Sequence, residues 1–243
     1  MVSALPMEVH PDASAVARRA ATWIAEAARE AIKERGRFVV ALSGGNTPLQ
    51  MLHFLATETI DWQKVHVVQV DERVAPVGSP DRNLTQLREA LLAHVSIPAG
   101  QVYPMPVETA DIAAAAEGYG QLLNRLAGSP SVLDLVQLGL GADGHTASLV
   151  PGGAALAVTA ADVAVTAGYK GWRRMTLTFT IINRARRILW LVTGAEKSAV
   201  VARLTVGDDS LLASRVRRAS ALVMVDQAAA ASLHLQTAQQ GRT

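Results

Sequence analysis

The chain has 243 residues, 50% of them hydrophobic, and its 23 basic and 21 acidic side chains leave a formal net charge of +2. That length and apolar content suit one large α/β domain or two small ones. Because cysteine is absent, disulfides, thiolate catalysis and cysteine-ligated zinc are excluded.

The sequence carries no signal of a membrane or nucleic-acid protein. Its first residues lack a basic start followed by an apolar run, and no apolar stretch approaches the length of a membrane span. The densest basic cluster, at residues 215–218, has no interleaved aromatic residues and is typical of a solvated surface. We therefore expect a cytoplasmic protein that binds neither membrane nor nucleic acid.

Strand and helix patterns alternate along the first half of the chain. A long helix is predicted over 11–36, capped by Asp12 or Ser14 and ended by Gly36. The later elements, in order, are a strand at 37–42, a helix at 46–57, a strand at 65–70 and a helix at 83–95.

The second half continues the alternation. Helices are predicted at 110–126, 196–204 and 227–235, and strands at 133–140, 162–167, 175–180, 187–193 and 220–225. Such alternation without repeats or linkers predicts one α/β domain built on a mostly parallel sheet flanked by helices.

Polar residues follow four of the predicted strands directly. These segments are 43–47, 71–73, 139–145 and 194–197. Because the carboxyl ends of parallel strands share one edge of a sheet, we expect the four segments to meet in one ligand crevice.

The first segment, Ser43, Gly44, Gly45, Asn46 and Thr47, is either a tight strand-to-helix turn or an anion site. Two glycines let the backbone approach a ligand, and the next helix directs its free N–H groups at that place, which suits phosphate. The segment is not a P-loop, because no Gly-Lys-Ser/Thr follows it.

The third segment contains Gly139, Gly141 and Gly144, the GxGxxG spacing of dinucleotide-binding loops. It lies past mid-chain, however, and Asp143 would place a negative charge where pyrophosphate should bind. The nearest later acid, Asp162, precedes a predicted strand instead of ending one. We interpret the glycines as a turn that presents His145 as a general base oriented by Asp143.

The remaining segments supply cations. Asp71, Glu72 and Arg73 form either a surface ion-pair cluster or a site where Arg73 binds phosphate or a developing oxyanion. Arg173 or Arg174 heads a predicted strand and one of them can face the crevice, while Lys197 is one of four lysines. The other histidines, at positions 10, 53, 66, 94 and 234, lack metal-ligand spacing, so no metal site is predicted.

Taken together, these motifs resemble the 6-phosphogluconolactonase family, which is related to glucosamine-6-phosphate deaminase. The similarity rests on "ALSGGNTPLQML", "VDERVAP", "PDRNL", "DLVQLGLGADGHTASLVPG", "RRMTLTF" and "LVTGAEKSAVV", and covers about residues 8–235 of a single domain spanning 1–243. Asn46, where serine is commoner, and Arg82 beside Asn83 are small departures.

The resemblance implies a modified Rossmann-like fold, no metal or organic cofactor, and hydrolysis of 6-phospho-D-glucono-1,5-lactone in the oxidative pentose phosphate pathway. His145 is the expected base, with Asp143 orienting it and Asp71 contacting the substrate. The expected phosphate clamp is residues 43–47, Arg174 and Lys197, with Arg73 as phosphate ligand or oxyanion stabiliser. The division of roles among these cations, Arg82 and Arg173 stays open, and we expect a monomer or weak dimer.

Two alternatives remain. Deaminases of the related group carry a glutamate shortly after the Asp-Gly-His element, whereas no acid lies between His145 and Asp162 here. A non-enzymatic sugar-phosphate sensor of the same fold usually has a DNA-binding segment ahead of the domain, and it has little use for an Asp143–His145 pair.

Overall fold

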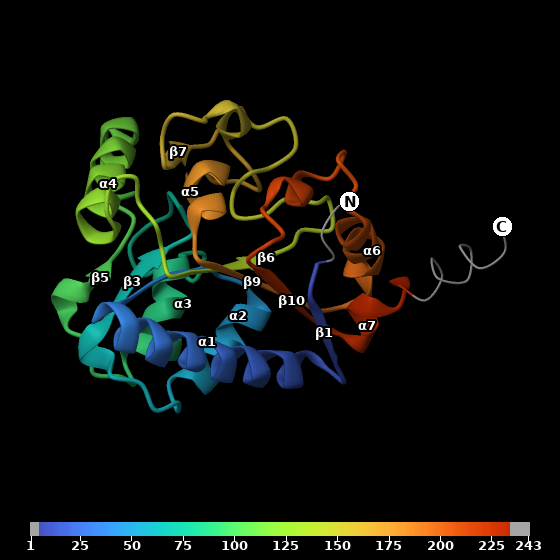
Figure 1. Cartoon of the computed structure of the whole chain (residues 1–243). Coiled ribbons are helices and arrows are strands. Elements are labelled where there is room, and N and C mark those ends of the chain that lie inside the picture. Colours follow the sequence, from blue (N-terminus) through green and yellow to red (C-terminus); the bar gives the residue numbers. More distant parts are fainter. Residues whose placement is uncertain (1–4, 234–243) are drawn as a thin grey trace, which may run out of the picture.

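The computed structural model describes residues 5–233, and a seven-stranded sheet runs through its middle (Figure 1). All six neighbouring strand pairs in this sheet are parallel. Across the sheet the strands are β1 (Met7–His10), β10 (Ala221–Asp226), β9 (Arg187–Val192), β6 (Leu135–Gly139), β2 (Phe38–Leu42), β3 (Val65–Gln69) and β5 (Val102–Tyr103). The prediction of a mostly parallel sheet is confirmed.

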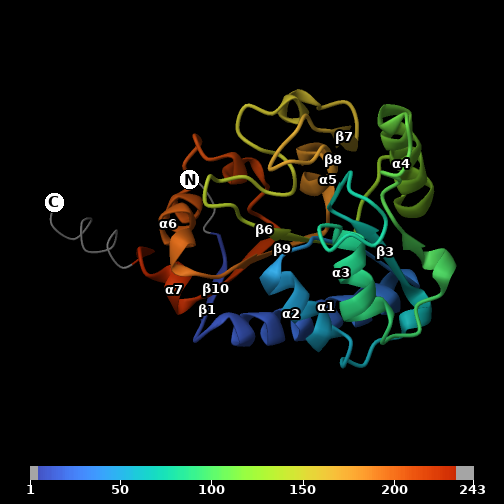
Figure 2. The same cartoon turned by 180° about the vertical axis from the view of Figure 1, so that it is seen from behind.

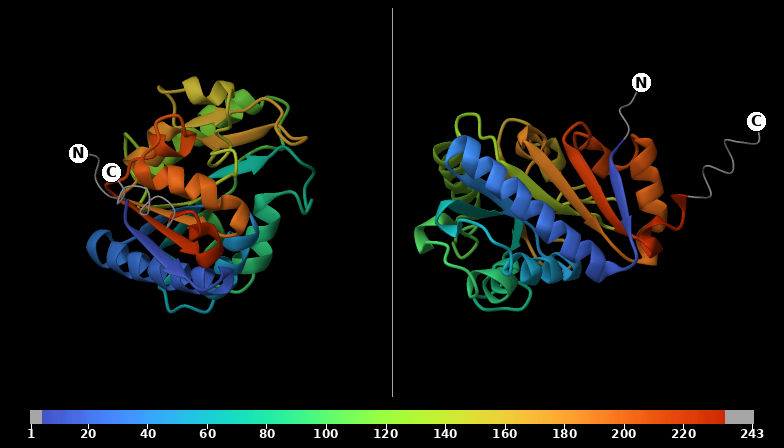
Figure 3. Two further views of the ribbon diagram at one scale, coloured as in Figure 1. Left: turned by 90° about the vertical axis from the view of Figure 1, so that its right-hand side faces the viewer. Right: turned by 60° about the horizontal axis from the view of Figure 1, so that its bottom comes forward.

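Helices cover both faces of the sheet, as the view from behind also shows (Figure 2). On one face are α1 (Ala13–Arg35), α2 (Asn46–Leu55) and α3 (Asn83–Leu87), with α1 lying across the strands (Figure 3). On the other are α4 (Ile112–Ala127), α5 (Phe179–Arg184), α6 (Ser198–Val206) and α7 (Gln227–Ala230).

Strand β2 shows why a continuous apolar run suits this position. Phe38, Val40 and Leu42 pack into the core beneath α1 and α2, while Val39 and Ala41 enter the core on the opposite face. A parallel strand that is buried on both faces needs apolar side chains at every residue.

A second, three-stranded antiparallel sheet lies beside the first. It consists of β4 (Asp71–Arg73), β8 (Arg174–Leu177) and β7 (Val163–Val165). The predicted strands at 162–167 and 175–180 therefore belong to this small sheet, and 71–73, predicted as a loop, is a strand. The strand at 175–180 is wrong beyond Leu177, because α5 begins at Phe179 and buries Ile181 and Ile182.

The ends of the helices follow local capping chemistry. The side chain of Asp12 accepts a hydrogen bond from Ala15 N, so Asp12 is the cap of α1, and Gly36 ends the helix in the left-handed conformation. The predicted helix at 83–95 continues from α3 through a π-helical turn at Arg88–Leu92 and ends there, three residues early. The helix predicted at 227–235 is α7 at its start, while 234 and 235 lie outside the described residues.

Strands β1 and β5 were not predicted, because they are short edge strands of four and two residues with little apolar signal. In the described part of the chain, no helix is both long and apolar enough to cross a bilayer.

The order of the central strands determines where a ligand can bind. Strands β2 and β6 are neighbours, but the chain continues from β2 to β3 on one side and from β6 to β9 on the other. The loops after β2 and β6 therefore part from each other and leave a crevice at the carboxyl edge, which is the usual ligand position in open α/β sheets.

Candidate active site

A pocket of about 370 Å³ lies at this crevice. All four predicted polar segments contribute to it, together with β8. Its lining includes every predicted substrate-contacting residue, namely Ser43, Gly44, Gly45, Asn46, Thr47, Asp71, Arg73, His145, Arg174 and Lys197. Asp143 is the one predicted site residue outside the lining, and it contacts His145 directly.

His145 is held by Asp143. The imidazole Nδ1 lies 2.5 Å from Asp143 Oδ1, and the backbone N–H of His145 donates to the same oxygen at 3.3 Å. Burial favours a higher pKa for Asp143, but hydrogen bonds from His145 and from the Tyr169 hydroxyl outweigh it and lower that pKa. An ionised Asp143 accepts a hydrogen bond from Nδ1–H, so the lone pair of a neutral imidazole is on Nε2.

Gly141 makes this pairing possible. Its N–H donates to the carbonyl of His145 at 2.8 Å and closes the loop, and a Cβ at this position would collide with the imidazole and with the Asp143 carboxylate. The glycine loop does not open a helix: the next helical turn begins at Ala154, unlike the βα unit of a dinucleotide-binding fingerprint.

The segment after β2 lines the pocket and leads into α2. Gly45 precedes the helix with φ 121° and no side-chain cap, so the amides of the first turn are left to face the pocket. Both donors of Ser43 are engaged, since its N–H and its hydroxyl reach Gln137 Oε1 at 3.1 and 2.9 Å. Thr47 Oγ1 shares a hydrogen bond of 2.6 Å with Thr193 Oγ1.

Because side chains alternate along the short strand β4, the three charged residues of the Asp-Glu-Arg segment do not all face the pocket. Asp71 and Arg73 line the pocket, while Glu72 is fully buried and accepts hydrogen bonds from the first amides of α3. Arg82 is also buried and lies 3.2 Å from Glu72 and 2.7 Å from Glu108. Arg82 therefore serves the fold, and it does not line the pocket.

Of the two arginines that head β8, Arg174 lies in the pocket and Arg173 is exposed outside it. Arg174 Nη1 is 3.7 Å from Asp71 Oδ2, and its Nε is buried without a partner. Burial lowers the pKa of Arg174 and neighbouring Arg73 lowers it further, while Asp71 opposes both. Two guanidinium groups close together favour an anion between or beside them.

Lys197 enters from the segment after β9. The N–H of Gly194 donates to both oxygens of Asp226 at 3.1 Å, which ties this segment to the end of β10. Within residues 5–233, Lys197 makes no ion pair, so its ammonium group is available to a ligand.

Three residues of this region were missed by sequence reasoning. Asn83 and Thr193 line the pocket, and Tyr169 contacts Asp143 from outside it. Thr193 ends a predicted strand at the carboxyl edge, and Asn83 follows the Asp-Glu-Arg segment, so the sequence position of each residue already indicated that it lies near the pocket. Tyr169 had none, because it lies in an unassigned turn.

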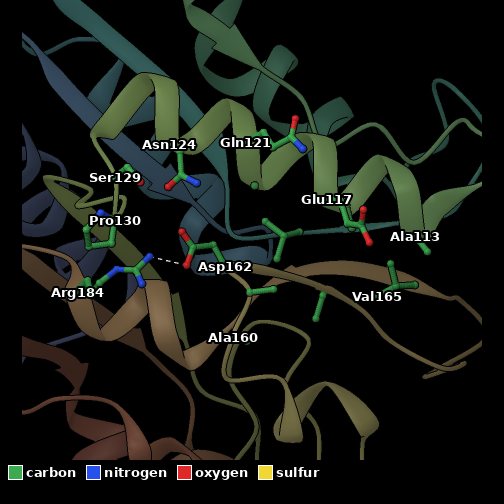
Figure 4. A pocket seen from close by; sticks show the side chains of 15 residues that line it. Ala113, Glu117, Gln121, Asn124, Ser129, Pro130, Ala160, Asp162, Val165 and Arg184 are labelled. Atoms are coloured by element: carbon green, nitrogen blue, oxygen red, sulfur yellow. Dashed lines mark hydrogen bonds and ion pairs between the residues drawn. The ribbon is translucent and has the colours of Figure 1, made fainter.

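A larger hollow of about 730 Å³ lies elsewhere, between α4 and β7 (Figure 4). None of the predicted site residues lines it. Among the residues that line it, Asp162 pairs with Arg184 at 2.5 Å, so Asp162 has a structural partner (Figure 4). No group of three or more His, Cys, Asp and Glu side chains in the described part of the chain is arranged to hold a metal ion.

Comparison with known proteins confirms the resemblance. Residues 11–224 match the family of glucosamine-6-phosphate isomerases/6-phosphogluconolactonase. The 6-phosphogluconolactonase of Synechocystis sp. is 43% identical over 74% of this chain and 76% of that protein, and that of Nostoc sp. is 37% identical over 93% and 98%.

Solved structures agree. The 6-phosphogluconolactonase from Trypanosoma brucei superposes with a TM-score of 0.84 at 28% identity, over 95% of this chain and 100% of that one. A monomeric glucosamine-6-phosphate deaminase shares the fold at a TM-score of 0.80 and 22% identity, over 94% and 100%. The chain therefore belongs to the family of glucosamine-6-phosphate isomerases and 6-phosphogluconolactonases.

Proposed function

We propose that this protein hydrolyses 6-phospho-D-glucono-1,5-lactone to 6-phospho-D-gluconate, the second step of the oxidative pentose phosphate pathway. The observation that carries the proposal is a histidine oriented by an aspartate in a pocket that also holds a helix N-terminus and three cations. Relatives that cover most of the chain are named 6-phosphogluconolactonases, which supports the same reaction.

In the proposed reaction His145 Nε2 takes a proton from water, and the resulting hydroxide adds to the lactone carbonyl carbon. The carbonyl oxygen becomes an oxyanion. When the bond between this carbon and the ring oxygen breaks, the imidazolium returns its proton to that oxygen. Asp143 keeps the imidazole in the tautomer with its lone pair on Nε2 and stabilises the transient positive charge.

The proposed phosphate clamp is the first turn of α2, Arg174 and Lys197. Free amides, a buried guanidinium with a spare donor and an ammonium group without an ion pair are complementary to a phosphate dianion. Gln137 orients the segment before α2 by holding Ser43. Binding the remote phosphate positions the carbonyl against the base.

Arg73 is proposed as phosphate ligand or oxyanion stabiliser, since one of its nitrogens is held by Asp81 O at 2.6 Å while the residue faces the pocket. Asp71 is proposed to contact the sugar, where its carboxylate can accept hydrogen bonds from hydroxyl groups.

A deaminase or isomerase of the same family is the second candidate. No acid lies between His145 and Asp162, which favours the lactonase, but Glu196 lines the pocket from another segment and could assist sugar ring opening. A pure sugar-phosphate sensor is the third candidate, and the hydrogen-bonded Asp143–His145 pair argues against it.

The test is to generate the lactone in situ with glucose-6-phosphate dehydrogenase and to follow its disappearance with and without the protein. We expect hydrolysis well above the spontaneous rate, before and after exhaustive EDTA treatment, because a protein base activates the water. Glucosamine-6-phosphate, supplied separately, should release no ammonia. Robust ammonia release would establish the deaminase instead, and EDTA inactivation reversed by a divalent ion would contradict the cofactor-free mechanism.

Three properties predicted from the sequence also stay predictions. If residues 1–243 form a single domain, the protein should unfold in one transition. If it is a monomer or weak dimer, light scattering should give the corresponding mass, and if it is cytoplasmic, it should be recovered in the cytosolic fraction of cells.

A further inference from the structure

Tyr169, outside the pocket lining, contacts both members of the Asp143–His145 pair. Its hydroxyl donates to Asp143 Oδ2 at 3.2 Å, on the carboxylate oxygen that His145 does not use. Its ring meets the imidazole edge to face, with the centroids 5.5 Å apart and the planes at 68°. We propose that Tyr169 is a positioning residue for the base and acts through Asp143.

The local backbone places Tyr169 at this point. Tyr169 and Trp172 exchange hydrogen bonds of 2.9 and 3.2 Å across a two-residue turn formed by Lys170 and Gly171. Both turn residues have positive φ, 48° and 84°, as the tight primed turns of hairpins require. The turn lies in the connection between β7 and β8, so the phenol is carried on a defined turn.

Asp143 needs a second anchor, because its side chain is 41% exposed and water competes for both oxygens. A carboxylate held at one oxygen can still rotate, and the imidazole then follows it. With Oδ1 bound to His145 and Oδ2 bound to Tyr169, the carboxylate plane is fixed at both ends. This rotation determines where Nε2 points, which is what a general base needs to have fixed.

The same ring also touches the proposed phosphate clamp. The guanidinium carbon of Arg174 lies 5.4 Å from the centroid of the Tyr169 ring, within the range of a cation–π contact. The hydroxyl of Tyr169 therefore serves the base, and its ring serves both His145 and Arg174. Replacing Tyr169 by phenylalanine removes the hydroxyl alone, whereas alanine also removes the ring, so the two variants separate the two contributions.

The charges around the pair are otherwise unchanged by these substitutions. The groups that face the same pocket are Asp71, Arg73, Arg174, Glu196 and Lys197, and Lys170 lies over the Tyr169 ring from the turn. A change in pH dependence on removing the hydroxyl is therefore a change at Asp143 and the imidazole that it holds.

The experiment compares Y169F, Y169A and the matched control Y103F with the wild-type enzyme. Tyr103 also makes a hydroxyl-to-histidine contact, 3.0 Å to His66 Nδ1, but neither residue lines the pocket. Because the proposal rests on the proposed lactonase function, kcat and KM are measured with lactone made in situ from pH 5 to 8.

We expect Y169F to lower kcat about threefold to tenfold with little change in KM, and to move the acid limb of kcat to higher pH. Without the phenol, Asp143 is protonated at a higher pH and, when ionised, holds a protonated imidazole more strongly. Y169A should in addition raise KM, because Arg174 loses the ring. Y103F should match the wild type in all three measurements.

A second readout does not depend on turnover. The ¹³C resonance of the Asp143 carboxyl, assigned with D143N, reports its titration, and the pKa of Asp143 should be higher in Y169F than in the wild type and in Y103F. Inactive wild-type protein would refute the proposed function, while this titration would still test Tyr169. A Y169F variant with wild-type kcat, acid limb and Asp143 titration would refute the positioning role.

Discussion

The imidazole of His145 contacts both a carboxylate and a phenol, and these two neighbours orient a histidine that stands in a loop. The same dependence on neighbours separates the arginines: Arg174 lines the pocket, whereas Arg82 pairs with Glu72 and Glu108 outside it. At the scale of the residue, a side chain can bind a ligand only where its hydrogen-bonding groups reach the pocket and are not used by other residues of the fold.

Replacing His145 tests the base directly. H145N should lower kcat about 100- to 10,000-fold, the usual contribution of a general base, while circular dichroism and inhibitor binding stay unchanged. H94N is the control, because His94 is exposed and its imidazole contacts the carbonyl of Glu89, away from the pocket. Activity of H145N within a few-fold of wild type would remove His145 from the mechanism.

Replacing Lys197 tests the phosphate clamp. K197A should weaken inhibition by 6-phosphogluconate roughly tenfold or more, because a charge-assisted contact is worth about 1.5–3 kcal/mol, and should leave inhibition by gluconate unchanged. K64A is the matched control, since Lys64 is exposed and pairs with Asp61. An equal loss for both inhibitors would mean that Lys197 does not bind the phosphate.

At the scale of the element, the loop after β6 works as a closed turn. Its own backbone bonds bring Asp143 and His145 together, and Gly144 lies against Leu211 of the segment after α6, which fastens the loop to the rest of the fold. The loop holds the Asp143–His145 pair without a helix, so its shape depends on glycines where side chains approach.

Gly141→Ala tests this shape. The added methyl group overlaps the imidazole and the carboxylate, so the pair must move, and a displacement of about 1 Å can cost roughly 100-fold in kcat. Gly118→Ala is the control, because its site on α4 is exposed and open, and it should raise the free energy of unfolding by about 0.5–1 kcal/mol. Wild-type kcat in G141A would show that the close approach is unimportant.

At the scale of the whole molecule, buried polar groups join the layers. Tyr119 of α4 donates its hydroxyl to the carbonyl of Tyr103 in β5 at 2.7 Å and accepts from Gln69 N of β3 at 3.4 Å. The hydroxyl is fully buried, and this burial raises the pKa of Tyr119 above its ordinary value of 10.0.

This raised pKa predicts a loss of stability in alkali. Above about pH 10 an unfolded chain releases the Tyr119 proton while the folded chain keeps it, so the free energy of unfolding falls as pH rises. Urea unfolding at pH 8, 10 and 11 measures the slope. Y119F should lose about 1 kcal/mol at pH 8, for the missing hydrogen bond, and show a shallower decline. Identical slopes for both proteins would contradict a buried, protonated Tyr119.

Local sequence determined much of this protein. The extents of α1 and β2 follow from Asp12, Gly36 and an unbroken apolar run, signals that depend on neighbours a few residues apart. The meeting of four polar segments at one edge also followed from sequence, because parallel strands share a direction.

The tertiary structure alone decided which strands pair and which distant side chains meet. Strands were predicted at 162–167 and 175–180, but which sheet they join depends on chain paths far apart in sequence. Pairing of β4 with β8 then turns Asp71 toward the pocket and Glu72 away from it. Tyr169 reaches Asp143 only across 26 residues of chain, and no local pattern encodes a contact between two distant turns.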